Sequence, residues 1–188
     1  KTGLFSACLS ANLPGLSIVP VAVSYDLVLE DHVLARQKVK RRQRAFSREL
    51  AEMVRYAVGY RSRAFVTFGR PIALDGYDGE SRRSVLDLAH LVQNQIGRLY
   101  KVVPTAVLAA AMRPNISRAD LSDRITAILD TLGATGANLA VHTAAEVLES
   151  ATEPLQTRGI IVVDEGRYRV RDRNVLRYYG RSIQHLIT

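Results

Sequence analysis

The chain has 188 residues, of which 47% are hydrophobic and 23% charged, and its formal net charge is +8. This composition excludes a disordered chain and predicts a packed globular protein with a basic surface, which attracts the phosphate groups of nucleic acids, anionic lipids or small molecules. A single cysteine, Cys8, excludes an internal disulfide, and the four histidines have no metal-binding spacing, so we expect no metal and no other cofactor.

The chain opens with small and apolar residues at helical spacing, which predict a short helix over residues 3–12. The next segment, SIVPVAVSYDLVLED at residues 17–31, carries no charge between residues 18 and 24 and is rich in β-branched side chains. Such a segment is typical of a parallel strand that is buried on both faces. Pro20 is unusual in its middle, because proline cannot donate a ladder hydrogen bond.

This strand would bring Tyr25 and Asp26 to its carboxyl end, where α/β proteins form their sites; the alternative is that the two residues only end the strand. Residues 33–58 have apolar side chains at the three-and-four spacing of an amphipathic helix. Residues 62–74, SRAFVTFGRPIAL, alternate as a second strand does. The first 75 residues therefore predict helix, strand, helix and strand, the closing half of an α/β layer with a right-handed crossover.

Helices dominate the rest of the predicted structure. After a charged loop, apolar periodicity predicts helices over residues 85–102, 104–112, 117–133 and 143–159. The segment GIIVVDEGRYRVRD predicts a β-hairpin that turns at Glu165 and Gly166, and a last helix follows. We therefore predict two domains, the C-terminal part of an α/β domain over residues 1–78 and a helical domain with one β-hairpin over residues 79–188.

The densest run of positive charge lies in the predicted helix over residues 33–58. It contains Lys38, Lys40, Arg41, Arg42 and Arg44, with no acidic neighbour before Glu49. These side chains either contact phosphate groups or an anionic membrane surface, or form a solvated helix face. No apolar run approaches the roughly 18 to 20 residues of a membrane-spanning helix, so we expect any membrane contact to be peripheral.

Two other functional classes, a nucleic-acid-binding module and an enzyme with a complete catalytic site in this chain, find less support. The C-terminal helices and hairpin resemble a winged helix, but the helix before the hairpin carries Glu146, Glu149 and Glu153 and no basic residue, so we expect no nucleic-acid partner. A winged-helix nucleic-acid-binding module remains the competing class. The chain also holds no nucleophile motif, no glycine-rich phosphate loop and no histidine followed five residues later by aspartate, and therefore no complete catalytic site.

Segments spread over nearly the whole chain resemble the glycerol-3-phosphate acyltransferase family, in particular its bacterial, membrane-associated type. They are KTG at 1–3, IVPVAVSYDLVLED at 18–31, RAFVTFGRPIAL at 63–74, VVPTAVLAAAM at 102–112 and VLRYYGRSIQHLI at 175–187. No single segment is specific, but their order and spacing together are. Arg181 is a departure, because the family usually has asparagine near that position.

The resemblance implies the closing half of a glycerolipid-acyltransferase-type αβ layer followed by a mainly α C-terminal region with one β-hairpin. It also implies transfer of a fatty acyl group from acyl-ACP or acyl-CoA to the sn-1 hydroxyl of glycerol 3-phosphate, which gives lysophosphatidic acid for phospholipid biosynthesis. The enzyme would be peripheral, at the cytoplasmic face of the cell membrane. Acylation of dihydroxyacetone phosphate or lysophosphatidate is the alternative within the class.

The family's fourth motif is a hydrophobic strand with a central proline, and it corresponds to residues 18–23. The resemblance thereby implies substrate-binding roles for Val19, Pro20 and Val21, and also for Lys1. For Tyr25 we expect such a role from its place at the carboxyl end of the predicted strand. The family's His-x-x-x-x-Asp pair and its main phosphate-binding arginines precede this region. We therefore expect the catalytic residues upstream of Lys1 and no activity from this chain alone.

Overall fold

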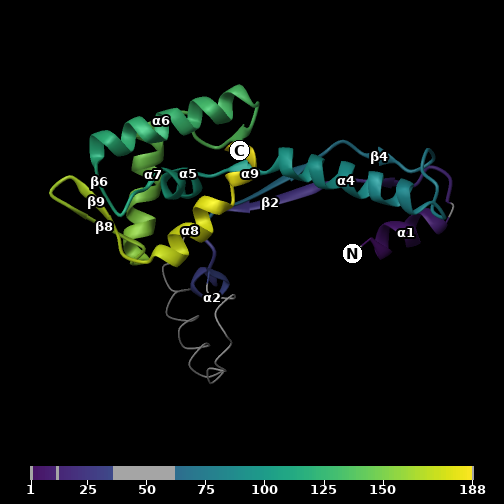
Figure 1. Cartoon of the computed structure of the whole chain (residues 1–188), viewed down its shortest axis with the longest axis horizontal. Coiled ribbons are helices and arrows are strands. Elements are labelled where there is room, and N and C mark those ends of the chain that lie inside the picture. Colours follow the sequence, from purple (N-terminus) through teal and green to yellow (C-terminus); the bar gives the residue numbers. More distant parts are fainter. Residues whose placement is uncertain (1, 12, 36–61, 188) are drawn as a thin grey trace, which may run out of the picture. The chain divides into compact units, whose positions relative to one another are not determined.

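A computed structural model describes residues 2–11, 13–35 and 62–187 (Figure 1). The chain is a mixed α/β protein with small sheets, in agreement with the coarse prediction. Its contacts divide it into two compact units. Unit 1 comprises Lys1–Val23 and Phe65–Lys101, and unit 2 comprises Ser24–Ala64 and Val102–Thr188. The domain boundary predicted between residues 78 and 79 stays a prediction.

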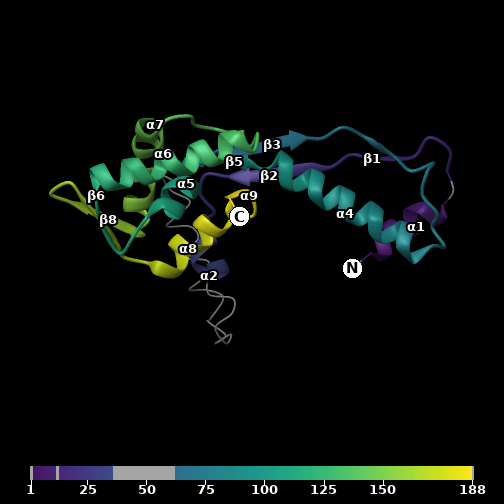
Figure 2. The ribbon, with the colours of Figure 1, turned by 45° about the horizontal axis from the view of Figure 1, so that its top comes forward.

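Unit 1 is built on one long amphipathic helix and a short one. Its described elements include α1 (Gly3–Ser10), β1 (Ser17–Ile18), β4 (Ile72–Ala73) and α4 (Arg82–Leu99). The apolar face predicted for α4 is confirmed in part, because Val85, Leu88 and Val92 are buried whereas Ile96 is 38% exposed. Helix α1 packs against α4, and β1 pairs antiparallel with β4 (Figures 1 and 2). The core of this unit is small, and it consists of Leu9, Ile72, Leu74, Val85, Leu88 and Val92.

Strands β2 (Val21–Tyr25) and β3 (Ala64–Phe68) form a two-stranded sheet. The N–H of Gly69 donates to the carbonyl of Pro20 at 2.8 Å, and the N–H of Asp26 donates to the carbonyl of Arg63 at 3.1 Å. The start of each strand thus lies beside the end of the other, and the arrows of β2 and β3 point in opposite directions in Figure 2. The strands are antiparallel, so the predicted parallel strand with a crossover connection is wrong.

The prediction that this strand is buried on both faces is also wrong. Along β2, Ala22 and Ser24 are 4% and 1% exposed, whereas Val23 and Tyr25 are 44% and 48% exposed. An uncharged, β-branched segment is compatible with a parallel strand and with an antiparallel one, because the polarity of its side chains does not depend on the direction of the neighbouring strand. The helix predicted over residues 33–58 is described only in α2 (Asp31–Ala35).

Unit 2 surrounds a short buried helix. Its described helices are α2, α5 (Pro104–Ala111), α6 (Arg118–Ala134), α7 (Ala144–Thr157), α8 (Arg173–Arg181) and α9 (Gln184–Ile187). Helices α6, α7 and α8 all contact α5, which is apolar all round and almost wholly buried, as such helices are. Side-chain caps begin α6 and α7: Ser117 Oγ accepts from the N–H of Asp120, and Thr143 Oγ1 accepts from the N–H of Glu146.

A three-stranded antiparallel sheet flanks these helices. It consists of β6 (Asn115–Ser117), β9 (Arg167–Val170) and β8 (Ile161–Asp164), in that spatial order, while β5 (Lys101–Val102) pairs with β7 (Asn138–Leu139). The predicted hairpin is confirmed, and Glu165 and Gly166 take the left-handed conformations of its turn, with φ of 46° and 72°. Over the described part of the chain, no helix combines the length and the apolar character that crossing a bilayer requires.

Candidate functional site

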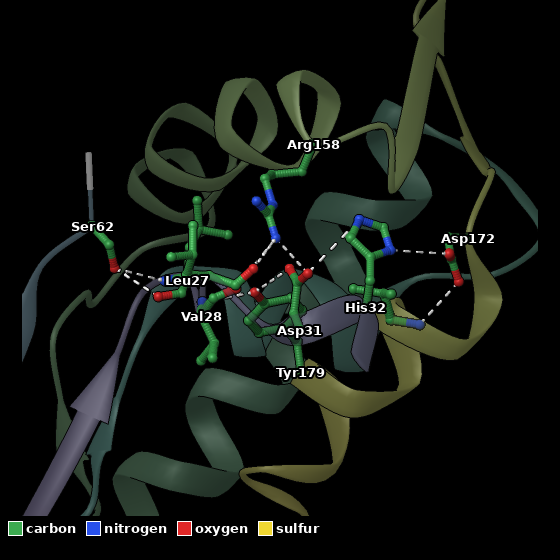
Figure 3. A network of polar contacts seen from close by, with 10 residues as sticks. Leu27, Val28, Asp31, His32, Ser62, Arg158, Asp172 and Tyr179 are labelled. Carbon is green, nitrogen blue, oxygen red and sulfur yellow. Dashed lines mark hydrogen bonds and ion pairs between the residues drawn. The ribbon is translucent and has the colours of Figure 1, made fainter. Parts of the chain in front are cut away.

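The most connected polar group of the described structure is the carboxylate of Asp31, at the start of α2. Its side chain is fully buried, and it lies between Arg158 and Tyr179 (Figure 3). Arg158 Nη2 donates to Asp31 Oδ1, and Tyr179 Oη donates to Asp31 Oδ2 at 2.7 Å. A buried carboxylate is tolerated when both of its oxygens are bonded in this way, because the bonds offset the loss of hydration.

The same two partners also hold the backbone before α2. Arg158 Nη2 donates to the carbonyls of Val28 and Leu29 at 3.3 and 3.2 Å. The hydroxyl of Tyr179 accepts from the N–H of Val28 at 3.0 Å while it donates to Asp31. Burial, and then the neighbouring Asp31 carboxylate, raise the pKa of Tyr179, so the hydroxyl stays neutral and remains a donor.

His32 extends this arrangement to the beginning of α8. Its Nδ1 lies 3.5 Å from Oδ2 of Asp172, and its Nε2 lies 3.8 Å from Oδ1 of Asp31. The other oxygen of Asp172 caps α8 by accepting from the N–H groups of Asn174 and Val175. A carboxylate beside one imidazole nitrogen is the geometry of a general base, but here both nitrogens face carboxylates. The arrangement lets the imidazole of His32 bridge α2 and the start of α8.

We call Asp31, His32, Arg158, Asp172 and Tyr179 the Asp31 network. Three helices supply it: α2 gives the first two residues, the end of α7 precedes Arg158, and α8 with its cap gives the others. Residues more than 120 positions apart thereby meet at one point. The network anchors the chain at the start of α2.

The returning chain is anchored close by. Ser62 Oγ accepts from the N–H of Leu27 at 3.1 Å and donates to the carbonyl of Leu27 at 2.8 Å (Figure 3). Arg63 Nε contacts Asp26 Oδ2 at 2.6 Å, and Thr105 Oγ1 donates to the backbone carbonyl of Asp26. Residues 26–35 and 62–63 therefore form a fixed stem, from which residues 36–61 leave and to which they return.

The predicted substrate residues lie on and beside β2. Pro20 is buried and falls between β1 and β2, outside both strands, where its carbonyl accepts from Gly69. Its missing N–H therefore interrupts no bond within a strand. Val19 and Tyr25 are 44% and 48% exposed, and Val21 is half-buried. Their substrate-binding role stays a prediction.

The predicted phosphate or membrane contacts, Lys38, Lys40, Arg41, Arg42 and Arg44, lie outside the described residues, as does Lys1. Their sequence context is nevertheless informative. Residues 36–61 hold nine Lys and Arg residues and two Glu residues, so they carry +7 of the net charge of +8. Lys1 supplies the remaining positive charge, and the described residues are neutral overall. The basic character of the protein is therefore concentrated in the segment that leaves the stem.

The sequence reasoning missed the Asp31 network. Asp172 alone had a local signal, because an aspartate before a helix is a common cap. The other members are single residues in segments that show no spacing or repeat linking them. In the part of the chain that the structure describes, no cluster of three or more His, Cys, Asp or Glu residues is arranged to hold a metal ion.

No model of a known protein family matches the chain, and a comparison with curated proteins gives no match either.

Proposed function

We propose that the chain is part of a glycerol-3-phosphate acyltransferase. The observation that carries this proposal is that four of the segments on which the resemblance rests meet at the stem. Asp26 and Asp31 come from the segment at 18–31, and they contact Arg63, Thr105 and Tyr179. Those three residues come from the segments at 63–74, 102–112 and 175–187. Segments that contact one another are expected to keep a common order and spacing, which supports reading them as one pattern.

The proposed reaction moves a fatty acyl group from acyl-ACP or acyl-CoA to the sn-1 hydroxyl of glycerol 3-phosphate. It needs a base for that hydroxyl, donors for the developing oxyanion and cations for the phosphate. The base is expected from residues upstream of Lys1, since this sequence holds no His-x-x-x-x-Asp pair. The role of the present chain is then to supply β2 and its neighbours and to hold the stem.

We further propose that residues 36–61 contact an anionic membrane surface. Their net charge of +7 supports this, because each Lys or Arg near an anionic bilayer contributes about 1 kcal/mol. The protein would then act as a peripheral protein at the cytoplasmic face of the cell membrane.

An acyltransferase assay tests the enzymatic part. A longer polypeptide that includes this chain and an upstream His-x-x-x-x-Asp pair should acylate glycerol 3-phosphate, whereas the 188-residue chain alone should not. Turnover by the chain alone would refute the expected division of roles. Acylation of dihydroxyacetone phosphate or lysophosphatidate, and not of glycerol 3-phosphate, would replace the proposed acceptor by the alternative one.

A second candidate, a winged-helix nucleic-acid-binding module, is favoured by the order of elements in unit 2. Helix α5, strand β6, helices α6 and α7 and the β8–β9 hairpin follow one another, and β6 completes the sheet beside β9. Electrostatics disfavour it. Glu146, Glu149 and Glu153 are all exposed on α7, and a cavity of about 440 Å³ beside this helix is lined by the last two.

The arginines of the hairpin also have local partners. Arg169 lies 3.9 Å from Asp164, and Arg167 donates to Asn115 at 3.0 Å. Binding assays separate the two candidates. Sedimentation with anionic vesicles but not with neutral ones supports the membrane enzyme, and a salt-dependent mobility shift of duplex DNA without vesicle binding supports the winged helix.

A further inference from the structure

Strand β3 exposes an unusual amount of apolar surface. Val66 and Phe68 are 54% and 69% exposed, and Val23 on β2, on the same face, is 44% exposed. Of the large apolar side chains that are exposed in the described residues, most lie in unit 1. Single exposed apolar residues are ordinary, but a contiguous group on one sheet face marks an interaction surface.

In the described part of the chain, no strand pairs with the outer edge of β3. In an antiparallel pair, every second residue points its N–H and C=O groups at the partner strand. The bonds of Arg63 and Gly69 to Asp26 and Pro20, which flank β2, therefore place Ala64, Val66 and Phe68 with their backbone groups directed to the other edge. Within the described residues, the sheet has two strands, so no third strand pairs there. A two-stranded sheet is at best marginally stable without further cover.

The sequence of this edge strand also lacks the features that prevent exposed edge strands from pairing with strands of other molecules. Exposed edge strands usually carry a charged residue, a proline or a bulge. The sequence of β3 is AFVTF, which contains none of these side chains. Its backbone groups and side chains are therefore suited to an extended, uncharged strand as the partner.

We propose that this partner is the same strand of a second copy of the chain. Two β3 strands would pair antiparallel about a two-fold axis beside Val66, which joins the two sheets into one four-stranded sheet. The edge of an antiparallel strand is self-complementary under such an axis, because each residue that donates also accepts from its symmetry mate.

The pairing of the outward-directed residues favours the register centred on Val66. Each Val66 then faces its symmetry mate, and Phe68 faces Ala64, so every outward-directed residue of β3 gains a partner. Arg63 falls opposite Gly69, and Arg70 falls opposite Ser62. Like charges therefore do not face one another, and Arg63 is in addition paired with Asp26 at 2.6 Å. Shifting the register by two residues would leave an outward-directed residue without a partner.

The two-fold axis gives a sharp test, since residue 66 of each copy would face itself. Val66→Lys and Val66→Glu each place like charges opposite one another, and each should weaken the dimer at least about tenfold in sedimentation equilibrium. An equimolar mixture of the two variants should regain the dimer, because Lys then faces Glu. Val33→Lys is the control: Val33 is 57% exposed and belongs to α2 rather than to β3, so the dimer should be unchanged.

Hydrogen exchange of the unsubstituted chain provides a second measurement that requires no variant to fold. The amides of Ala64, Val66 and Phe68 should become protected as the protein concentration rises, whereas those of Phe65 and Thr67 should not change. A chain that stays monomeric at every concentration overturns the proposal. So does a Val66→Lys variant that dimerises like the wild type, or a mixture that associates no better than either variant alone.

Discussion

Tyr179 and Asp31 lie 148 positions apart in the chain, and the tyrosine hydroxyl donates a hydrogen bond of 2.7 Å to the buried carboxylate. Tyr179→Phe removes the hydroxyl, so Oδ2 of Asp31 loses this hydrogen-bond donor. Hydrogen bonds to charged groups contribute roughly 1.5–3 kcal/mol, so the free energy of unfolding should fall by about that amount. Urea unfolding measures it. Tyr25→Phe is the control, since Tyr25 is 48% exposed and should change stability little.

Arg158 is the cationic partner of the same carboxylate, and its side chain is only 6% exposed. Arg158→Met leaves Asp31 buried without its counter-charge, so we expect a loss of about 3–5 kcal/mol in the free energy of unfolding. The exposed pair of Arg169 and Asp164 offers the contrast, and Arg169→Met should cost at most about 1 kcal/mol. Equal effects of the two substitutions would mean that the buried pair does not stabilise unit 2.

The raised pKa of Tyr179 has a consequence at high pH. Because the folded-state pKa lies above the ordinary value of 10.0, the unfolded protein releases this proton first. The contribution of Tyr179 to stability is therefore complete below pH 10 and is lost as the pH rises above it. Unfolding of wild type and Tyr179→Phe at increasing pH should show a steeper loss in the wild type. Parallel curves would contradict the assignment.

Much of unit 2 could be predicted from the sequence because its signals are local. The periodicity of α6 and α7 and the caps at Ser117 and Thr143 depend on residues three or four positions apart. The turn at Glu165 and Gly166 is likewise local. Strand β6 was missed because its three residues are too few to show alternation, and only its pairing with β9 makes it a strand.

The direction of β2 and β3 and the Asp31 network could not be predicted, because both depend on long-range contacts. The run from Ile18 to Ser24 is equally apolar whether its neighbour is parallel or antiparallel. Asp31 is one aspartate in an acidic turn, and nothing near it in the sequence indicates that it is buried against Arg158. The buried charge becomes understandable only when the partners from α7 and α8 are known.

The cap of α7 provides a prediction at low pH. The bond from the backbone N–H of His142 to Glu146, at 2.8 Å, is the main cause that lowers the pKa of Glu146 below its ordinary value of 4.5. The contribution of the ionised Glu146 side chain to stability is therefore present above pH 4.5 and is lost as the pH falls through the folded-state pKa. Glu146→Gln should reduce this acid dependence of the thermal midpoint, whereas Glu149→Gln, at an exposed position on the same helix, should not.

Thr143 completes the same cap and can be tested at neutral pH. Its Oγ1 accepts from the N–H of Glu146 at 3.2 Å, so Thr143→Ala should lower the free energy of unfolding by about 1 kcal/mol. Thr143→Ser keeps the hydroxyl and is the matched control. If both variants lose the same stability in urea unfolding, the hydroxyl does not act as the cap.

Gly69 lies where the chain of β3 passes closest to Pro20. A Cβ at this position would lie 2.8 Å from Cδ1 of Leu99 and 3.3 Å from the carbonyl oxygen of Pro20. Leu99 can turn away, but the backbone of Pro20 is held by its bond to Gly69 itself. Gly69→Ala should therefore lower the free energy of unfolding by about 1–3 kcal/mol through overpacking. Gly76→Ala, where nothing lies within 4 Å, should leave it unchanged or raise it by about 0.4–1 kcal/mol, because alanine restricts the unfolded chain. Equal stability of the two variants in urea would show that the junction between β1 and β2 tolerates a side chain beside Pro20.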